Sequence, residues 1–127
     1  MRFVLALCVA LCVAVLNAPP TQAEPSGFST VIDELPLMTG LQEVGDGVEF
    51  STRSGRLAEI ITEGNVSRTE VLTFYATTLP QLGWKREVET KFVREDESLS
   101  LAFEHMGEML RVQFTLAPLE SPPQKPQ

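Results

Sequence analysis

Two stretches near the C-terminal end of the chain have the clearest alternation of apolar and polar positions. Apolar residues stand at every second position from Leu99 to Phe103 and again from Leu110 to Leu116. A period of two is typical of a strand with one buried and one exposed face. Residues 48–52 and 56–62 carry strand signals on either side of the turn sequence Arg53-Ser54-Gly55, so we expect a β-hairpin there.

Residues 67–84 follow a helical period instead. Ser67 and Glu70 have the spacing of a capping box, in which each side chain accepts a hydrogen bond from the other residue's backbone N–H. Five apolar side chains fall within an arc of about 100° on one face: Val71, Leu72, Tyr75, Leu79 and Leu82. Gly83 is suited to end the helix in the left-handed conformation. Pro80 cannot donate to the carbonyl one turn earlier, so we expect the last turn to loosen.

These elements follow one another as strand, strand, helix, strand, strand, strand. Residues 84–88 form the first strand after the helix, and residues 91–94 either continue it or pair with it. An antiparallel sheet with one apolar face needs a cover, and the chain has one helix that can supply it. We therefore expect a two-layer α+β fold of order ββαβββ. In it, a single amphipathic helix covers one face of a curved antiparallel sheet of four to five strands.

Composition suggests where this domain begins and ends. We place the α+β domain at residues 35–117, after a loose leader at residues 24–34 that begins with turn-forming residues. Residues 118–127 are polar and rich in proline, which is typical of a disordered tail. Pro36 prevents a regular helix at the start of the domain, where we expect one or more apolar side chains to dock: Leu35, Leu37 or Met38.

The N-terminal residues have the layout of a secretory signal peptide. Arg2 supplies a positive charge, residues 3–16 are apolar, and Thr21-Gln22-Ala23 resembles a signal-peptidase site. The apolar run is shorter than the roughly 20 residues that a transmembrane helix needs, although a retained membrane anchor is the alternative interpretation. We therefore expect cleavage after Ala23, so that residues 1–23 are removed. The mature protein would be periplasmic or secreted and would not span a membrane.

Cysteine content and charge argue against several classes of function. Cys8 and Cys12 both lie in the apolar run, so cleavage leaves no cysteine for a disulfide, a nucleophile or a metal site. The formal charge of the whole chain is −7, and cleavage removes Arg2 but no acidic residue, so the charge becomes one unit more negative. A negative charge argues against nucleic acids and anionic membrane surfaces as partners.

Candidate catalytic and metal-binding residues are few. His105 is the only histidine, and its position in a predicted turn indicates a solvated residue. Several carboxylates gather near two predicted turns without the spacing of a calcium loop: Glu95, Asp96, Glu97, Glu104 and Glu108. The sequence has no nucleophile elbow and no glycine-rich phosphate loop. Asn65-Val66-Ser67 matches a glycosylation pattern, but Ser67 already serves as the helix cap. We therefore expect no enzymatic activity, no cofactor and no metal.

Two sequence segments together resemble a known class of protein. LPLMTGL at residues 35–41 and SRTEVLTFYATTLPQLGW at residues 67–84, followed by alternating strands, are similar to short exported bacterial proteins. Members of that class share a proline-containing segment, a hairpin, a helix that ends in Leu-Gly-Trp, and further strands. The resemblance covers roughly residues 35–116. It implies the α+β fold and an exported location, and it implies no activity and no site residues.

The outer face of the predicted sheet is the surface that we expect to be functional. Four long polar side chains are expected to line up there as a contact face: Lys91, Arg94, Arg111 and Gln113. We therefore expect an exported accessory or binding protein that contacts another envelope protein. Two alternatives remain, namely a carrier that holds a small apolar ligand near Trp84 and Tyr75, and a carboxylate-based hydrolase.

Overall fold

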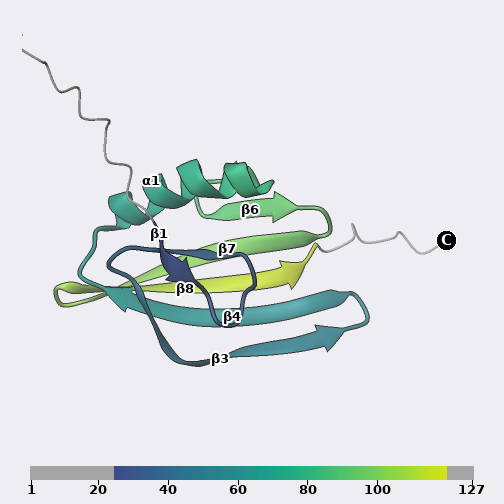
Figure 1. Ribbon diagram of the computed structural model, residues 1–127, viewed down its shortest axis with the longest axis horizontal. Coiled ribbons are helices and arrows are strands. Elements are labelled where there is room, and N and C mark those ends of the chain that lie inside the picture. Colours follow the sequence, from purple (N-terminus) through teal and green to yellow (C-terminus); the bar gives the residue numbers. More distant parts are fainter. Residues whose placement is uncertain (1–24, 120–127) are drawn as a thin grey trace, which may run out of the picture.

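The computed structural model describes residues 25–119, which form a sheet with one helix packed on it (Figure 1). The expected signal peptide and residues 120–127 of the expected tail lie outside the described residues. The described elements, in chain order, are β1 (Pro25–Phe28), β2 (Pro36–Met38), β3 (Gln42–Thr52), β4 (Gly55–Gly64), α1 (Arg68–Thr78), a 3₁₀ turn η1 (Leu79–Leu82), β5 (Lys85–Val88), β6 (Lys91–Arg94), β7 (Glu97–Met106) and β8 (Met109–Pro118).

The main sheet has six antiparallel strands in the order β3-β4-β8-β7-β6-β5, and it is open. The α+β class with one helix is therefore as expected, but the count of four to five strands is too low. Residues 91–94 pair with residues 85–88 instead of continuing them, which makes β5 and β6 a hairpin. A second, two-stranded sheet of β1 and β2 was not expected. Within the described chain, β3 and β5 are the two edges of the main sheet.

Helix α1 begins as the sequence predicts. The Ser67 Oγ accepts from the Glu70 N–H at 3.1 Å, and the Glu70 Oε2 accepts from the Ser67 N–H at 2.8 Å. The α-helix ends at Thr78, and the segment containing Pro80 continues as the 3₁₀ turn. Gly83 then stops the helix with a φ of 90°.

Most of the predicted apolar arc of α1 is buried against the sheet: Val71, Leu72, Tyr75 and Leu79. The prediction that Leu82 belongs to this arc is wrong, because its side chain is 37% exposed. A 3₁₀ turn has three residues per turn instead of 3.6, so it rotates Leu82 away from the arc.

The prediction of a loose leader at residues 24–34 is also wrong for residues 25–34. β1 pairs with β2, and Ile32, in the loop between them, belongs to the core with 2% exposure. Ile32 is apolar and is held by a turn in which the Ser29 Oγ accepts from the N–H groups of Val31 and Ile32. The turn-forming residues of this segment therefore form a tight turn, and the burial of Ile32 holds that turn in an ordered conformation.

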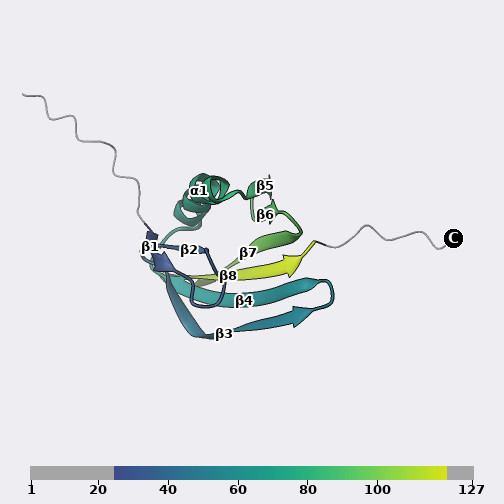
Figure 2. The same cartoon turned by 45° about the vertical axis from the view of Figure 1, so that its right-hand side comes forward.

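One tyrosine joins this N-terminal hairpin to the helix. Tyr75 is completely buried, and its hydroxyl donates to the Pro36 carbonyl at 2.9 Å and accepts from the Met38 N–H at 3.4 Å. Its ring contacts Phe74 and Phe114 edge to face. Leu35 and Met38 are buried in the same core and Leu37 packs against it, as expected for the docking of this segment. Figure 2 shows the hairpin beside α1, on the same side of the sheet.

The chain makes a close backbone contact where β4 ends. A Cβ placed on Gly64 would come within 2.8 Å of the carbonyl carbon of Gly40, and it would overlap the Gly40 carbonyl oxygen. Only glycine fits at this position, because the obstacle is backbone and cannot rotate away. This contact holds the turn before β3 against the end of β4.

Candidate functional site

The sheet has an inner face, which packs against α1 and the N-terminal hairpin, and an outer face, which points away from them. Directly paired residues of antiparallel strands point to the same side. The register therefore assigns the outer face, since Ile60, Phe114 and Leu101 are paired inner residues of the core. The outer face has a polar centre on β7 and β8 and an apolar margin on β3 and β4.

We call the apolar margin the β3–β4 patch. It consists of Val44, Val48 and Phe50 of β3, with Leu57 and Ile61 of β4 paired beside them. Val48 and Phe50 are each 53% exposed, whereas Leu57 and Ile61 are half-buried. The sequence predicted the hairpin but not this exposure. The alternation of Val48 and Phe50 was a signal for a strand, and only the position of β3 at the sheet edge leaves it exposed.

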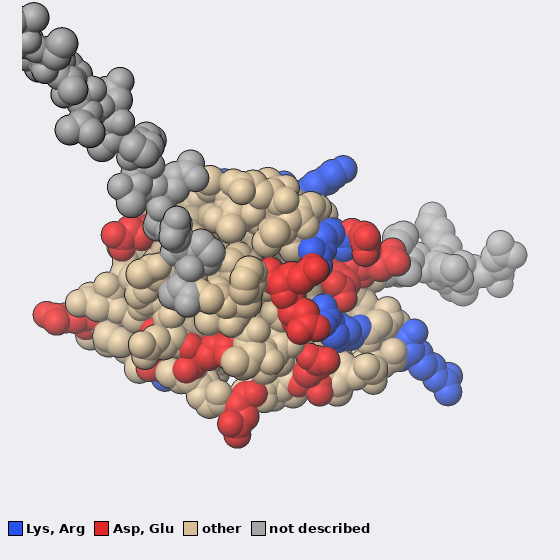
Figure 3. Space-filling view, viewed as in Figure 1, with Lys and Arg blue, Asp and Glu red and all other residues tan. Residues whose placement is uncertain are grey.

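Carboxylates lie on both faces of the sheet near the β3–β4 patch. Glu59 is beside Val48 on the outer face, whereas Glu49 pairs with the core residue Ala58 and points to the inner face. Asp46 lies in the irregular part of β3, and none of the three forms an ion pair within residues 25–119. Figure 3 shows acidic side chains along the lower rim of the molecule, where β3 runs in Figure 1. The patch is therefore apolar with a negative border.

Glu43, also on β3, is engaged within the protein. The N–H and the hydroxyl of Thr30 donate to its carboxylate, the hydroxyl at 2.6 Å. Partial burial is the largest single influence and raises the pKa of the Glu43 carboxyl. Hydrogen bonds from Ser29 and Thr30 together outweigh burial and leave the pKa below its ordinary value. This carboxylate ties the N-terminal loop to β3 and is not part of the negative border.

Three of the four predicted contact residues lie together on the outer face. Lys91 is paired with Ser100, and Gln113 and Arg111 follow one another along β8. The Arg111 guanidinium already has partners. It donates to the Glu63 Oε1 from Nη2 at 2.8 Å and from Nε at 3.0 Å, and to the Glu104 Oε2 at 3.3 Å. The hydrogen bond to Glu63 is the main influence that raises the pKa of Arg111.

The prediction that Arg94 joins this row is wrong, because Arg94 lies on the inner side. Residues 91 and 94 are three apart on one strand, and side chains alternate, so the two must point to opposite faces. Arg94 stacks over the ring of Trp84 at 4.5 Å, donates to the Leu82 carbonyl at 3.1 Å and pairs with Glu34 at 3.1 Å. Its surroundings indicate a structural role.

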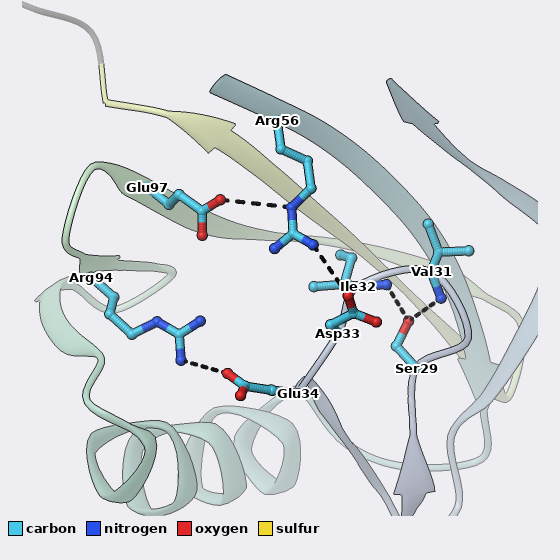
Figure 4. A network of polar contacts seen from close by, with 8 residues as sticks. All are labelled: Ser29, Val31, Ile32, Asp33, Glu34, Arg56, Arg94 and Glu97. Carbon is cyan, nitrogen blue, oxygen red and sulfur yellow. Dashed lines mark hydrogen bonds and ion pairs between the residues drawn. The ribbon is translucent and has the colours of Figure 1, made fainter. Parts of the chain in front are cut away.

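Figure 4 shows this ion pair together with the contacts that hold the N-terminal loop on the inner face. Asp33 pairs with Arg56 at 3.6 Å, and Arg56 reaches Glu97 at 3.7 Å on the other side. The two arginines thus connect the loop to β4, β6 and β7. The three carboxylates and two guanidinium groups of this arrangement are paired with one another within the domain, so the arrangement stabilises the fold.

A shallow groove of about 340 Å³ is lined by α1 and by residues of β5 and the turn after it. Threonines of the helix line it, together with Arg68, Arg86 and Glu89. Arg68 pairs with Glu89 at 3.3 Å and lies over the ring of Phe103, and Arg86 donates to the Glu89 carbonyl. Arg68 and Glu89 are therefore paired with each other, and Arg86 is bonded to backbone.

The remaining candidate residues are dispersed or buried. His105 is exposed near the end of β7, and Glu95 and Asp96 form the turn before that strand. Within residues 25–119, no group of three or more histidine or carboxylate side chains is placed to hold a metal ion. Tyr75 and Trp84 are core residues. No helix in this part of the chain has the length and apolar character needed to cross a bilayer.

Comparison with known proteins identifies no relative of this chain. A scan against protein-family models, a search of curated proteins and a search of solved structures each return no match.

Proposed function

We propose that this chain is a non-enzymatic exported protein that acts by contact with another protein of the cell envelope. The observation that supports the proposal is the β3–β4 patch, where two large apolar side chains are more than half exposed. Exposed apolar groups that adjoin one another and are bordered by polar residues are typical of contact surfaces. The sequence pattern of residues 1–23 supports export.

The outer face also has the composition of a contact surface. Polar side chains of β7 and β8 lie beside the apolar margin, as in interfaces with an apolar core and a polar rim. The Glu63–Arg111–Glu104 arrangement is held together by ion pairs, so it offers a preformed polar surface. No specific observation favours the carrier alternative, because the Tyr75 and Trp84 rings are packed against protein groups. None favours the hydrolase alternative either.

Site-specific photo-crosslinking in envelope extract tests the proposed function. A photoreactive side chain is placed at Gln113, in the centre of the outer face, and in a matched control at Thr73, on the exposed side of α1. We expect one discrete cross-linked product from position 113 and none from position 73. If no position on the outer face yields a product, the protein does not act by contact through this face.

Export has a separate test. Expression of the full chain, followed by cell fractionation and N-terminal sequencing, should recover the protein outside the cytoplasm with Glu24 as its first residue. Recovery of the intact chain from the cytoplasm would contradict an exported location.

A further inference from the structure

We propose that β3 is a docking edge for an extended segment of a partner protein in which basic and apolar residues alternate. This inference rests on the proposed function, because it assigns the edge and the partner chemistry to a contact protein. The segment would add to the sheet as a further strand, a mode of recognition in which backbone hydrogen bonds provide affinity and side chains provide specificity.

The position of β3 makes such an addition possible. β3 has 11 residues and is outermost in the main sheet, so one side of its backbone faces no other described strand. Figures 1 and 2 both show β3 at the margin with nothing beyond it. Residues 48–52 pair in continuous register with residues 55–59, so this half of the strand is regular. A regular edge offers unpaired N–H and C=O groups at alternate residues.

The side chains on this half of β3 favour an apolar neighbour. Val48 and Phe50 are both on the outer face, and a strand added to β3 would place its own outward side chains about 5 Å away from them. Each contact would cover apolar surface that is now more than half exposed. The opposite edge differs, because β5 has only four residues and a register shift near Val88.

Charge complementarity identifies the partner as basic. Within residues 25–119, Asp46, Glu49 and Glu59 form no ion pair, and Arg53 at the tip of the hairpin is the nearest opposing charge on β3 or its turn. Glu49 pairs with the core residue Ala58, so it points to the inner face, opposite to Val48 and Phe50. On a strand added to β3, lysine or arginine side chains on the inner face would therefore lie beside Glu49, while their apolar neighbours on the outer face cover Val48 and Phe50. An acidic strand would be repelled.

A second copy of this chain fits the edge less well. Pairing of two β3 strands would place the acidic residues of one copy beside those of the other, and each chain carries a formal charge of −7. The chain departs from regular pairing between Val44 and Val48, where Gly45 and Gly47 have positive φ. Bulges and charges are devices that prevent indiscriminate edge pairing. Together they favour a partner of opposite charge that pairs with the regular half.

Fluorescence anisotropy with two synthetic peptides tests the inference. The probe is a fluorescein-labelled peptide of four Lys-Val repeats, and the control peptide has four Glu-Val repeats. We expect the Lys-Val peptide to bind and the Glu-Val peptide not to bind. Replacing Phe50 by Thr should weaken binding by about tenfold or more, because an aromatic anchor is lost. Val88→Thr is the matched control, since Val88 is 56% exposed on the opposite edge and its loss should leave binding unchanged.

A charge variant tests the second half of the inference. Glu49→Gln should weaken binding of the Lys-Val peptide several-fold and reduce its dependence on salt, because Glu49 is the carboxylate on the face that the lysines occupy. Circular dichroism of each variant checks that the fold is retained. Equal binding by the parent and Phe50→Thr, or tight binding of the Glu-Val peptide, would overturn the inference. A dimer in sedimentation analysis that Phe50→Thr dissociates would also overturn it, because the edge would then belong to a second copy.

Cross-linking separates this inference from the proposed function. A photoreactive side chain at Phe50 should give the same cross-linked product in envelope extract as the one at Gln113. Cross-linking from position 113 alone would retain the contact function and remove β3 as its edge. If neither position yields a product, both the proposed contact function and the docking edge on β3 are contradicted.

Discussion

Removal of one hydroxyl tests how the N-terminal hairpin is attached to the domain. In Tyr75→Phe the ring remains, so its contacts with Phe74 and Phe114 are kept. The change removes a hydrogen bond of 2.9 Å to the Pro36 carbonyl and a weaker one of 3.4 Å from the Met38 N–H. No water can replace the hydroxyl without opening the core, because Tyr75 is completely buried.

The magnitude follows from the two bonds. A hydrogen bond contributes about 0.5–1.5 kcal/mol net, and a buried polar group that loses its partner costs about 1–3 kcal/mol. Because the second bond is long, we expect Tyr75→Phe to lower the free energy of unfolding by about 2 kcal/mol. For a domain of this size, each kcal/mol lowers Tm by roughly 4–8 °C.

Two measurements check this expectation. Urea unfolding can be followed by the fluorescence of Trp84, the only tryptophan, and should give the loss in free energy. Hydrogen exchange should accelerate selectively at residues 25–38, for example at the Ser29 N–H that donates to the Leu35 carbonyl. Thr62→Val is the matched control, because it removes a buried hydroxyl that donates to the Val112 carbonyl at 3.0 Å and not to a group of the hairpin. It should destabilise the protein without selective exchange at residues 25–38.

The pH dependence provides an independent check. Burial raises the pKa of the Tyr75 hydroxyl, and the bond from Met38 opposes this with a smaller effect. The unfolded chain therefore loses the tyrosine proton at a lower pH than the folded protein, so stability falls as pH rises above about 10. Tyr75 is the only tyrosine, so Tyr75→Phe should show a shallower decline above this pH. A loss below about 0.5 kcal/mol with unchanged exchange at residues 25–38 and parallel pH profiles would refute the reasoning.

Further substitutions test other contacts of the fold. Gly64→Ala should reduce soluble yield or lower stability by more than about 4 kcal/mol, because the added Cβ meets backbone. Gly107→Ala, with a φ of 62° and open space around it, should cost only about 1 kcal/mol, and equal effects of the two would contradict the steric argument. Arg94→Ala should lower the free energy of unfolding by about 1–2 kcal/mol through loss of stacking and of the hydrogen bond to the 3₁₀ turn, as measured by urea unfolding. Arg53→Ala, at the exposed hairpin tip, is its control and should change stability little. Glu43→Gln should flatten the loss of stability as pH falls below about 4.3, because the folded pKa of Glu43 is lowered; an unchanged profile would contradict this.

Much of the local structure could be predicted from the sequence. The capping box at Ser67, the loosened last turn around Pro80 and the helix stop at Gly83 all depend on residues within one or two turns. The alternating strands β7 and β8 depend on a period of two that is visible in the chain itself. The opposite orientations of residues 91 and 94 could also have been deduced, because three residues separate them on one strand.

The candidate site could not be predicted in the same way. Val48 and Phe50 have the alternation of any half-buried strand, and their exposure depends on β3 being outermost and on which face α1 covers. Similarly, the turn-like residues 25–34 are ordered by contacts with Glu43, Arg56 and Arg94, which lie outside this segment in the chain.

By itself, the sequence determined the capped helix, its loosened end, the strand periodicity and the α+β class, since these depend on interactions between near neighbours in the chain. Only the tertiary structure decided the strand order, the docking of the N-terminal hairpin and the choice of β3 as the exposed edge. The physical reason is that burial depends on which distant segments meet, and a periodic pattern specifies a face without specifying what covers it.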